Sequence, residues 1–171
     1  MQNSDTPKVS LLVPICNVER YLRECLDSAV TQSLKDIEII CINDGSTDSS
    51  PDIIREYMER DERVKMIDKV NSGYGDSMNR GLEMARGEYV GILESDDFMF
   101  EDSLQKLVAK ADAEHADVVK GDFYLYWSTP SERRELFGII DEHMTGAAYR
   151  PVDRPGIFYR KPSIWSAIYR R

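Results

Sequence analysis

Two kinds of hydrophobic pattern alternate along the first 127 residues. Short apolar runs are separated by segments in which apolar residues recur every three or four positions, and these periods are typical of strands and helices respectively. The run Ile37–Ile42 is apolar at nearly every position, which is typical of a strand buried on both faces. The predicted strands are Val9–Val13, ended by Pro14, then Ile37–Ile42, Val64–Ile67, Tyr89–Leu93 and one within 117–126 centred on Val118.

Helices are predicted between these strands. The first follows Asn17, whose side chain can cap it, and the second begins near Pro51, which suits a first helical turn. The third covers about Asp76–Ala85, with Gly87 as its C-cap, and the fourth includes Leu104–Ala111. Strictly alternating strands and helices predict an α/β fold with a mostly parallel sheet and right-handed crossovers.

The regular pattern ends near Ser128. The segment 128–161 has few periodic stretches and many charged, proline and glycine residues. We therefore divide the chain into a regular core over 1–127 and a less regular region over 128–171.

Charge is also distributed unevenly along the chain. The 171 residues carry a net charge of −9, and this acidity argues against nucleic acid as the main partner. After His143, however, six basic residues stand against one acid, so this tail carries +5 and the first 143 residues carry −14. The tail could contact an anionic substrate or, peripherally, a membrane surface. A solvated charged surface over a few core aromatics explains it equally well.

The spacing of the cysteines and histidines argues against a C-x-x-C site and against a zinc site. Cys16, Cys25 and Cys41 form no C-x-x-C pair and are odd in number, which suits buried free thiols in a reducing compartment. His115 and His143 have no cysteine nearby, which argues against zinc. The apolar run 9–15 is too short to span a membrane and lacks the basic start of a signal peptide.

Polar side chains cluster where three predicted strands end. These clusters are 14–17, 43–46 and 94–97, and parallel topology places all three along one edge of the sheet, where ligands bind in such folds. Any one of them alone is more simply a turn or a helix cap. The last contains three acids, Glu94, Asp96 and Asp97, which repel one another unless a cation or ligand lies between them.

Carboxylates favour a hard cation, so Mg²⁺ or Mn²⁺ is the expected cofactor. An acidic domain would also repel a diphosphate unless a divalent cation bridged the two. Acids together with a metal therefore imply a phosphorylated ligand.

Other phosphate and nucleophile motifs are absent or incomplete. Gly73-Tyr74-Gly75 begins like G-x-G-x-x-G, but Met78 replaces the third glycine and the motif follows the third predicted strand. The sequence contains no G-x-x-x-x-G-K-[ST] and no G-x-S-x-G. The loop after the first strand lacks the glycines and basic residues that a nucleotidyltransferase would need.

Six motifs in a fixed order resemble the family 2 glycosyltransferases, inverting enzymes with a GT-A fold. The resemblance covers about residues 8–119, and any one motif alone is weak. The motifs are Val9–Glu19, Ile42–Asp48, Asn71–Gly73, Met78–Gly81, Ala85–Val90 and Glu94–Asp97.

The resemblance implies a nucleotide-diphosphate sugar as donor, most often a UDP-sugar, bound with Mg²⁺ or Mn²⁺. It makes 1–127 the donor-binding core and 128–171 the incomplete start of an acceptor-side region. Asp97 is the first expected metal ligand, and Asp96 contacts the metal or the ribose. The residues implied to line the base and ribose pocket are Pro14, Cys16, Asn17 and Asp44, and those bordering the donor are Asn71, Gly73, Asp76 and Asn79.

Three positions depart from the family pattern. Cys16 stands where an aromatic or similar residue is usual, Met78 where arginine is usual, and Glu94 where aspartate is frequent. These departures concern the identity of the donor more than the class of reaction.

The resemblance also implies a general base that activates an acceptor hydroxyl, and the acceptor would be a saccharide or a lipid-linked group. Asp141 and Glu142, the only late acid pair, do not match its setting. We therefore expect the base beyond Arg171, in a longer parent protein that acts in envelope polysaccharide synthesis. The protein would then be located in the cytoplasm, at the inner face of the membrane. A nucleotide-sugar-binding module without transfer activity, a metal-dependent nucleotidyltransferase and, last, an NAD-binding protein remain as alternatives.

Overall fold

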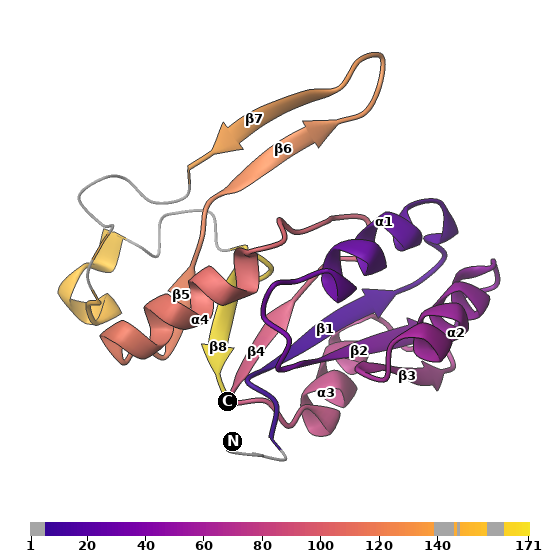
Figure 1. Ribbon diagram of the computed structural model, residues 1–171, viewed down its shortest axis with the longest axis horizontal. Coiled ribbons are helices and arrows are strands. Elements are labelled where there is room, and N and C mark those ends of the chain that lie inside the picture. The colour runs from indigo at the N-terminus through magenta and orange to yellow at the C-terminus, as the bar shows by residue number, and fades with distance from the viewer. Residues whose placement is uncertain (1–5, 139–145, 147, 157–162) are drawn as a thin grey trace.

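The computed structural model describes residues 6–138, 146, 148–156 and 163–171. Its centre is a six-stranded sheet with the order β3-β2-β1-β4-β8-β5, from which a two-stranded hairpin projects (Figure 1). The strands of the sheet are β1 (Val9–Ile15), β2 (Ile37–Asp44), β3 (Val64–Lys69), β4 (Tyr89–Ile92), β5 (Val118–Lys120) and β8 (Ala167–Arg170). The hairpin consists of β6 (Phe123–Trp127) and β7 (Arg133–Phe137).

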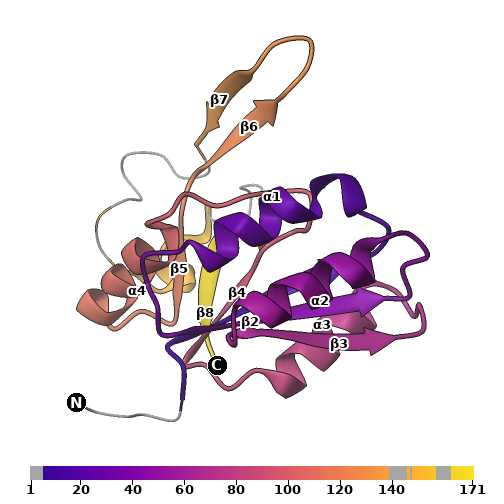
Figure 2. The same cartoon turned by 45° about the vertical axis from the view of Figure 1, so that its right-hand side comes forward.

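Helices cover both faces of the sheet, as the apolar pattern predicts (Figure 2). Alternate residues of β1 divide between two apolar clusters: Leu11 and Val13 pack with one set of helices, and Leu12 packs with Met78 on the other face. The first set is α1 (Glu19–Val30), α2 (Ser50–Arg60) and α4 (Ser103–Glu114), and the other face holds α3 (Tyr74–Met84). A short 3₁₀ turn covers Pro151–Asp153.

The predicted parallel core is confirmed for β1 to β4, which all pair in parallel. Two strands were not predicted, β7 of the hairpin and β8, and β8 inserts between β4 and β5 and runs antiparallel to both. Its Ile168 is fully buried, so the end of the chain contributes to the main core. The Arg170 guanidinium contacts Glu88 at 2.7 Å and Asp117 at 3.3 Å, so this tail residue is paired within the fold.

Four local expectations are wrong. The segment 117–126 forms parts of two strands, and Val118 is exposed instead of central. β1 runs through Pro14 because β4 pairs with β1 only as far as Leu12, so the missing N–H of Pro14 faces no partner strand. Asn17 does not cap α1, and Gly87 is not the C-cap of α3.

The start of α1 is capped from another segment. Asp48 accepts a hydrogen bond from the Glu19 amide at 3.0 Å, and Glu19 accepts one from the Ser49 amide at 2.8 Å. Asn17 instead has a φ of +53°, and its side-chain oxygen accepts from the Thr47 amide at 2.8 Å. These bonds fasten the loop after β1 to the loop after β2.

Gly87 serves close packing instead of a helix cap, because α3 already ends at Met84. A Cβ at Gly87 would lie 2.5 Å from the Ser10 amide nitrogen, a distance that no side chain tolerates. The Gly87 amide donates to the Ser10 hydroxyl at 2.8 Å, and that hydroxyl donates to buried Glu38 at 2.6 Å. Lys65 completes the cluster by donating to Glu38 at 2.7 Å. This cluster lies at the amino-terminal edge of the strands, opposite the edge where the polar loops meet.

None of the helices in the described ranges is long and apolar enough to cross a membrane.

Candidate functional site

The acidic cluster forms a tight turn directly after β4. The Asp97 amide donates to the Glu94 carbonyl at 3.0 Å, and the Leu93 amide donates to the Leu12 carbonyl at 2.9 Å, so the turn begins where β4 leaves β1. Ser95 is buried, whereas Asp96 and Asp97 are exposed. We call Glu94, Asp96 and Asp97 the acidic turn.

Electrostatic repulsion is concentrated in the acidic turn. Desolvation in this recessed part of the surface, together with the charges of Asp96 and Glu94, raises the pKa of Asp97. Desolvation also raises the pKa of Glu94, with a contribution from Asp96, although a hydrogen bond from the Tyr74 hydroxyl at 2.7 Å opposes it. Bringing a cation to the turn would relieve this repulsion.

The residues of the acidic turn fit a divalent cation that is shared with a ligand. Within the part of the chain that the structure describes, no three His, Cys, Asp or Glu side chains are arranged to hold a metal ion by themselves. Mg²⁺ sites in phosphate-binding proteins typically use only one or two carboxylates and take their remaining ligands from phosphates and water. Asp96 and Asp97 supply such a pair, and no described lysine or arginine forms an ion pair with either.

A second set of polar residues lies where β2 and β3 end. The side chain of Asp44 is almost buried, and both of its oxygens accept hydrogen bonds: Oδ1 from the Ser72 amide at 2.8 Å and Oδ2 from the Gly73 amide at 3.0 Å. Asn71 donates to the Asp44 carbonyl at 3.0 Å and lies 3.4 Å from the Cys16 sulfur. The structure therefore brings together Cys16, Asp44, Asn71 and Gly73, as the sequence predicts. Their roles toward a ligand stay predictions.

A lysine completes this second set, and sequence reasoning missed it. Lys69 contacts Asp44 at 2.5 Å and Asp76 at 3.3 Å, and its side chain is only 6% exposed. Desolvation alone would raise the pKa of Asp44, but the hydrogen bonds from Lys69 and from the Ser72 and Gly73 amides, with the charge of Lys69, together outweigh it and lower the pKa. We call Lys69, Asp44, Ser72 and Asp76 the Lys69 network.

Asn79 lies apart from that network. It lines a mainly apolar hollow of about 400 Å³ together with Met78, Leu82 and Tyr169. Pro14 is buried within β1, and Asn17 joins the loop after β2 through Thr47.

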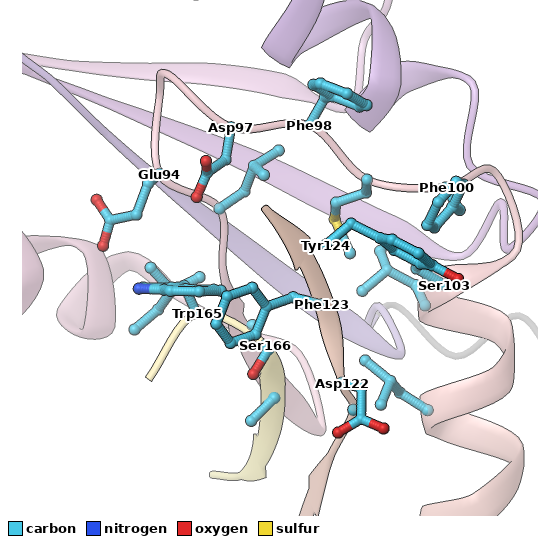
Figure 3. A pocket seen from close by; sticks show the side chains of 18 of the residues that line it. Glu94, Asp97, Phe98, Phe100, Ser103, Asp122, Phe123, Tyr124, Trp165 and Ser166 are labelled. Atoms are coloured by element: carbon cyan, nitrogen blue, oxygen red, sulfur yellow. The ribbon is translucent and has the colours of Figure 1, made fainter. Parts of the chain in front are cut away.

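The acidic turn also borders a cavity of about 570 Å³, which the sequence did not reveal (Figure 3). The cavity lies between the segment after β4, the start of α4, strand β6 and the residues before β8. Figure 3 shows Glu94 and Asp97 at one side, with Trp165 and Phe123 facing them. Trp165 and Phe123 make an edge contact with centroids 4.4 Å apart. The signal available in the sequence was the concentration of aromatic residues in 123–127, where only Leu125 is not aromatic.

The late acid pair, Asp141 and Glu142, lies outside the described residues, as do Arg160 and Lys161 of the basic tail.

Comparison with known proteins places this geometry in a family. The profile described as "Glycosyl transferase family 2" matches residues 10–165. The chain is 39% identical over 142 residues to glycosyltransferase GlyA of Streptococcus pneumoniae, covering 83% of this chain and 19% of that protein. It is 41% identical over 170 residues to the uncharacterized glycosyltransferase EpsJ of Bacillus subtilis, covering 96% of this chain and 48% of that protein.

Solved structures agree with the predicted GT-A arrangement. A crystal structure of S. aureus TarS 1-349 superposes with a TM-score of 0.75 and 26% identity, over 95% of this chain and 47% of that one. The complex of the same protein with UDP-GlcNAc gives a TM-score of 0.62 and 33% identity, over 65% of this chain and 33% of that one.

The chain thus spans between about a fifth and a half of the length of the relatives that it matches. The match nevertheless extends over most of this chain and includes both the acidic turn and the loops of the Lys69 network. The chain therefore belongs to glycosyl transferase family 2.

Proposed function

We propose that this chain is the donor-binding part of a glycosyltransferase that moves a sugar from a nucleotide-diphosphate sugar to an acceptor hydroxyl with inversion. The observation that supports it most is the meeting of the acidic turn with polar loops at the carboxyl edge of a parallel sheet, where α/β folds bind ligands. Tyr74 links the two parts, because it follows Gly73 directly and donates to Glu94.

A UDP-sugar is the proposed donor. TarS, at 33% identity, has been solved with UDP-GlcNAc, which makes this compound the first donor to test. Base and ribose would lie along Cys16, Asn17, Asp44 and Asn71, and the diphosphate would point toward the acidic turn. Asp76 belongs to the Lys69 network beside this pocket. Asn79 would border the pocket from the next turn of α3.

Mg²⁺ or Mn²⁺ would be held by Asp97, with Asp96, and would supply positive charge that stabilises the departing diphosphate. The protein's own contribution is to hold the turn in place: the hydrogen bond from the Asp97 amide to the Glu94 carbonyl fixes the backbone at Asp97, and the Tyr74 hydroxyl holds the Glu94 carboxylate to one side. Glu94 would thus add negative charge close to Asp96 and Asp97 without binding the metal itself.

The cavity beside the acidic turn is the proposed acceptor side. Aromatic rings such as Trp165, Phe123 and Tyr124 offer flat apolar faces, and Asp102 and Asp122 add carboxylates at its wall. This combination suits a saccharide or a lipid-linked saccharide. The base that would activate its hydroxyl is proposed to lie beyond Arg171.

A cytoplasmic location, at the inner face of the membrane for a lipid-linked acceptor, belongs to the same proposal. All three cysteines are free, and free thiols suit a reducing compartment. The cell process proposed is synthesis of envelope polysaccharide.

Calorimetric titration with a panel of nucleotides tests the donor class. In the presence of Mn²⁺ we expect UDP to bind more tightly than GDP, ADP and NAD⁺, because the pocket is proposed to select uracil. Failure of UDP to bind, or tighter binding of NAD⁺, would contradict the proposal. Release of UDP from UDP-GlcNAc by the full-length parent protein, absent with this chain alone, would separate a transferase from a binding module.

A further inference from the structure

A buried lysine lies in the middle of the proposed donor site. Lys69 ends β3, and its side chain is 6% exposed, which is rare for lysine unless its charge is paired. Its three N–H groups have three acceptors: Asp44 Oδ1 at 2.5 Å, Ser72 Oγ at 2.5 Å and Asp76 Oδ2 at 3.3 Å. The ammonium is fully used inside the protein, so it has no donor left for a ligand.

The lysine acts on two loops through Asp44. Asp44 accepts from Lys69 and from the amides of Ser72 and Gly73, which ties the end of β2 to the loop before α3. That contact is tight, because a Cβ on Gly45 would lie 2.6 Å from the Asn71 amide nitrogen. The orientation of the Asn71–Gly73 loop therefore depends on where the Asp44 carboxylate points.

Without the ammonium, two carboxylates would face each other across Ser72. Ser72 Oγ donates to Asp76 at 2.6 Å while its amide donates to Asp44. Arg80 on α3 reaches Asp76 at 2.9 Å, but Lys69 is the cation that neutralises Asp44. Asp68 on β3 is engaged separately by Asn43 at 2.7 Å.

Resting on the proposed function, we propose that Lys69 is a positioning residue of the donor site. It keeps Asp44 charged and aimed at the Asn71–Gly73 loop, so that this loop is preset for base and ribose. Lys69 acts through Asp44 and never touches the donor itself.

Two lysines on β3 give a matched experiment. Lys69→Met removes the ammonium at the carboxyl end of the strand, and Lys65→Met removes the one that pairs with buried Glu38 at the other end. Lys69→Arg restores the charge. The first measurement is the Kd of UDP with Mn²⁺ at pH 7.5 and pH 5.5 for all variants, each divided by the wild-type Kd at the same pH.

For Lys69→Met we expect Kd to rise about tenfold at pH 7.5, because UDP would then have to order a loop that Asp44 no longer holds in place. We expect a larger ratio at pH 5.5, because a buried carboxylate without its cation takes up a proton as pH falls. Lys65→Met should stay within about twofold of wild type at both pH values, and Lys69→Arg should recover most of the affinity at pH 5.5.

Hydrogen exchange at the Ser72 and Gly73 amides gives a second readout that needs no ligand. Both amides should exchange faster in Lys69→Met than in Lys65→Met when each is compared with wild type. Unchanged exchange together with a pH-independent Kd ratio near one would overturn the role of Lys69. Absence of UDP binding by the wild-type chain would instead overturn the proposed function, and the exchange result would then decide the role of Lys69 by itself.

Discussion

Replacing Asp97 with asparagine should reduce the affinity for UDP in the presence of Mn²⁺ by on the order of 100-fold, equivalent to about 2.7 kcal/mol. The substitution keeps the size of the side chain but removes the charge that we assign to the metal. It should not weaken the fold, because desolvation and the charges of Asp96 and Glu94 already raise the pKa of Asp97. A neutral side chain relieves that repulsion, so we expect the free energy of unfolding to stay equal or to rise.

This prediction is specific because Asp97→Asn should weaken UDP binding without lowering the free energy of unfolding. Glu101→Gln is the matched control, because it removes one exposed acid close to the turn without touching it. The control should bind UDP as the wild type does. An Asp97→Asn variant with wild-type affinity would contradict the assignment, and so would one whose affinity falls only in step with its stability.

The second large effect concerns the opposite edge of the sheet. Glu38→Gln should lower the free energy of unfolding at pH 7 by on the order of 3 kcal/mol. Burial alone would raise the pKa of Glu38, but hydrogen bonds from Lys65, Ser10 and the Arg86 amide outweigh it and lower the pKa to about 2, from 4.5 in the unfolded chain. A charged Glu38 is therefore worth more in the folded state than a neutral one.

The pH dependence follows from the direction of that shift. A lowered folded-state pKa stabilises the protein fully above the unfolded value of 4.5 and is lost as pH falls toward about 2. Urea unfolding at pH 7, 5 and 3.5 should thus show the gap between wild type and Glu38→Gln closing with acidity. Glu56→Gln, which breaks an exposed pair with Arg23, should cost less than about 1 kcal/mol. A gap for Glu38→Gln that does not change with pH would contradict the shift.

Local sequence pattern was sufficient for the parallel core. The runs in β1, β2 and β4 are apolar on both faces because helices cover both sides, and Leu11 and Leu12 face opposite clusters as adjacent strand residues must. The same logic placed three polar loops on one edge. The motifs of the family then assigned chemistry to residues that pattern alone would read as turns and caps.

Sequence pattern could not predict contacts between segments that are far apart along the chain. β8 is only four residues long, and it inserts between two strands, β4 and β5, that both lie far before it in the sequence, so nothing local marks it. From the sequence alone, Lys69 is expected to be a solvated residue at the end of a strand. Only the fold places Asp44 and Asp76 beside it. The cavity beside the acidic turn needs β6 and Trp165 together, which no local motif joins.

The central claim is that a metal held by the acidic turn bridges to the diphosphate of the donor. Calorimetric titration of the wild-type chain with UDP and with uridine, each with and without Mn²⁺, tests it most directly, because uridine has the same base and ribose but no phosphate. The account predicts that Mn²⁺ lowers the Kd of UDP by about tenfold or more, which corresponds to about 1.4 kcal/mol or more, and leaves the Kd of uridine unchanged. Equal affinity for UDP with and without Mn²⁺, or an equal response of uridine, would contradict it.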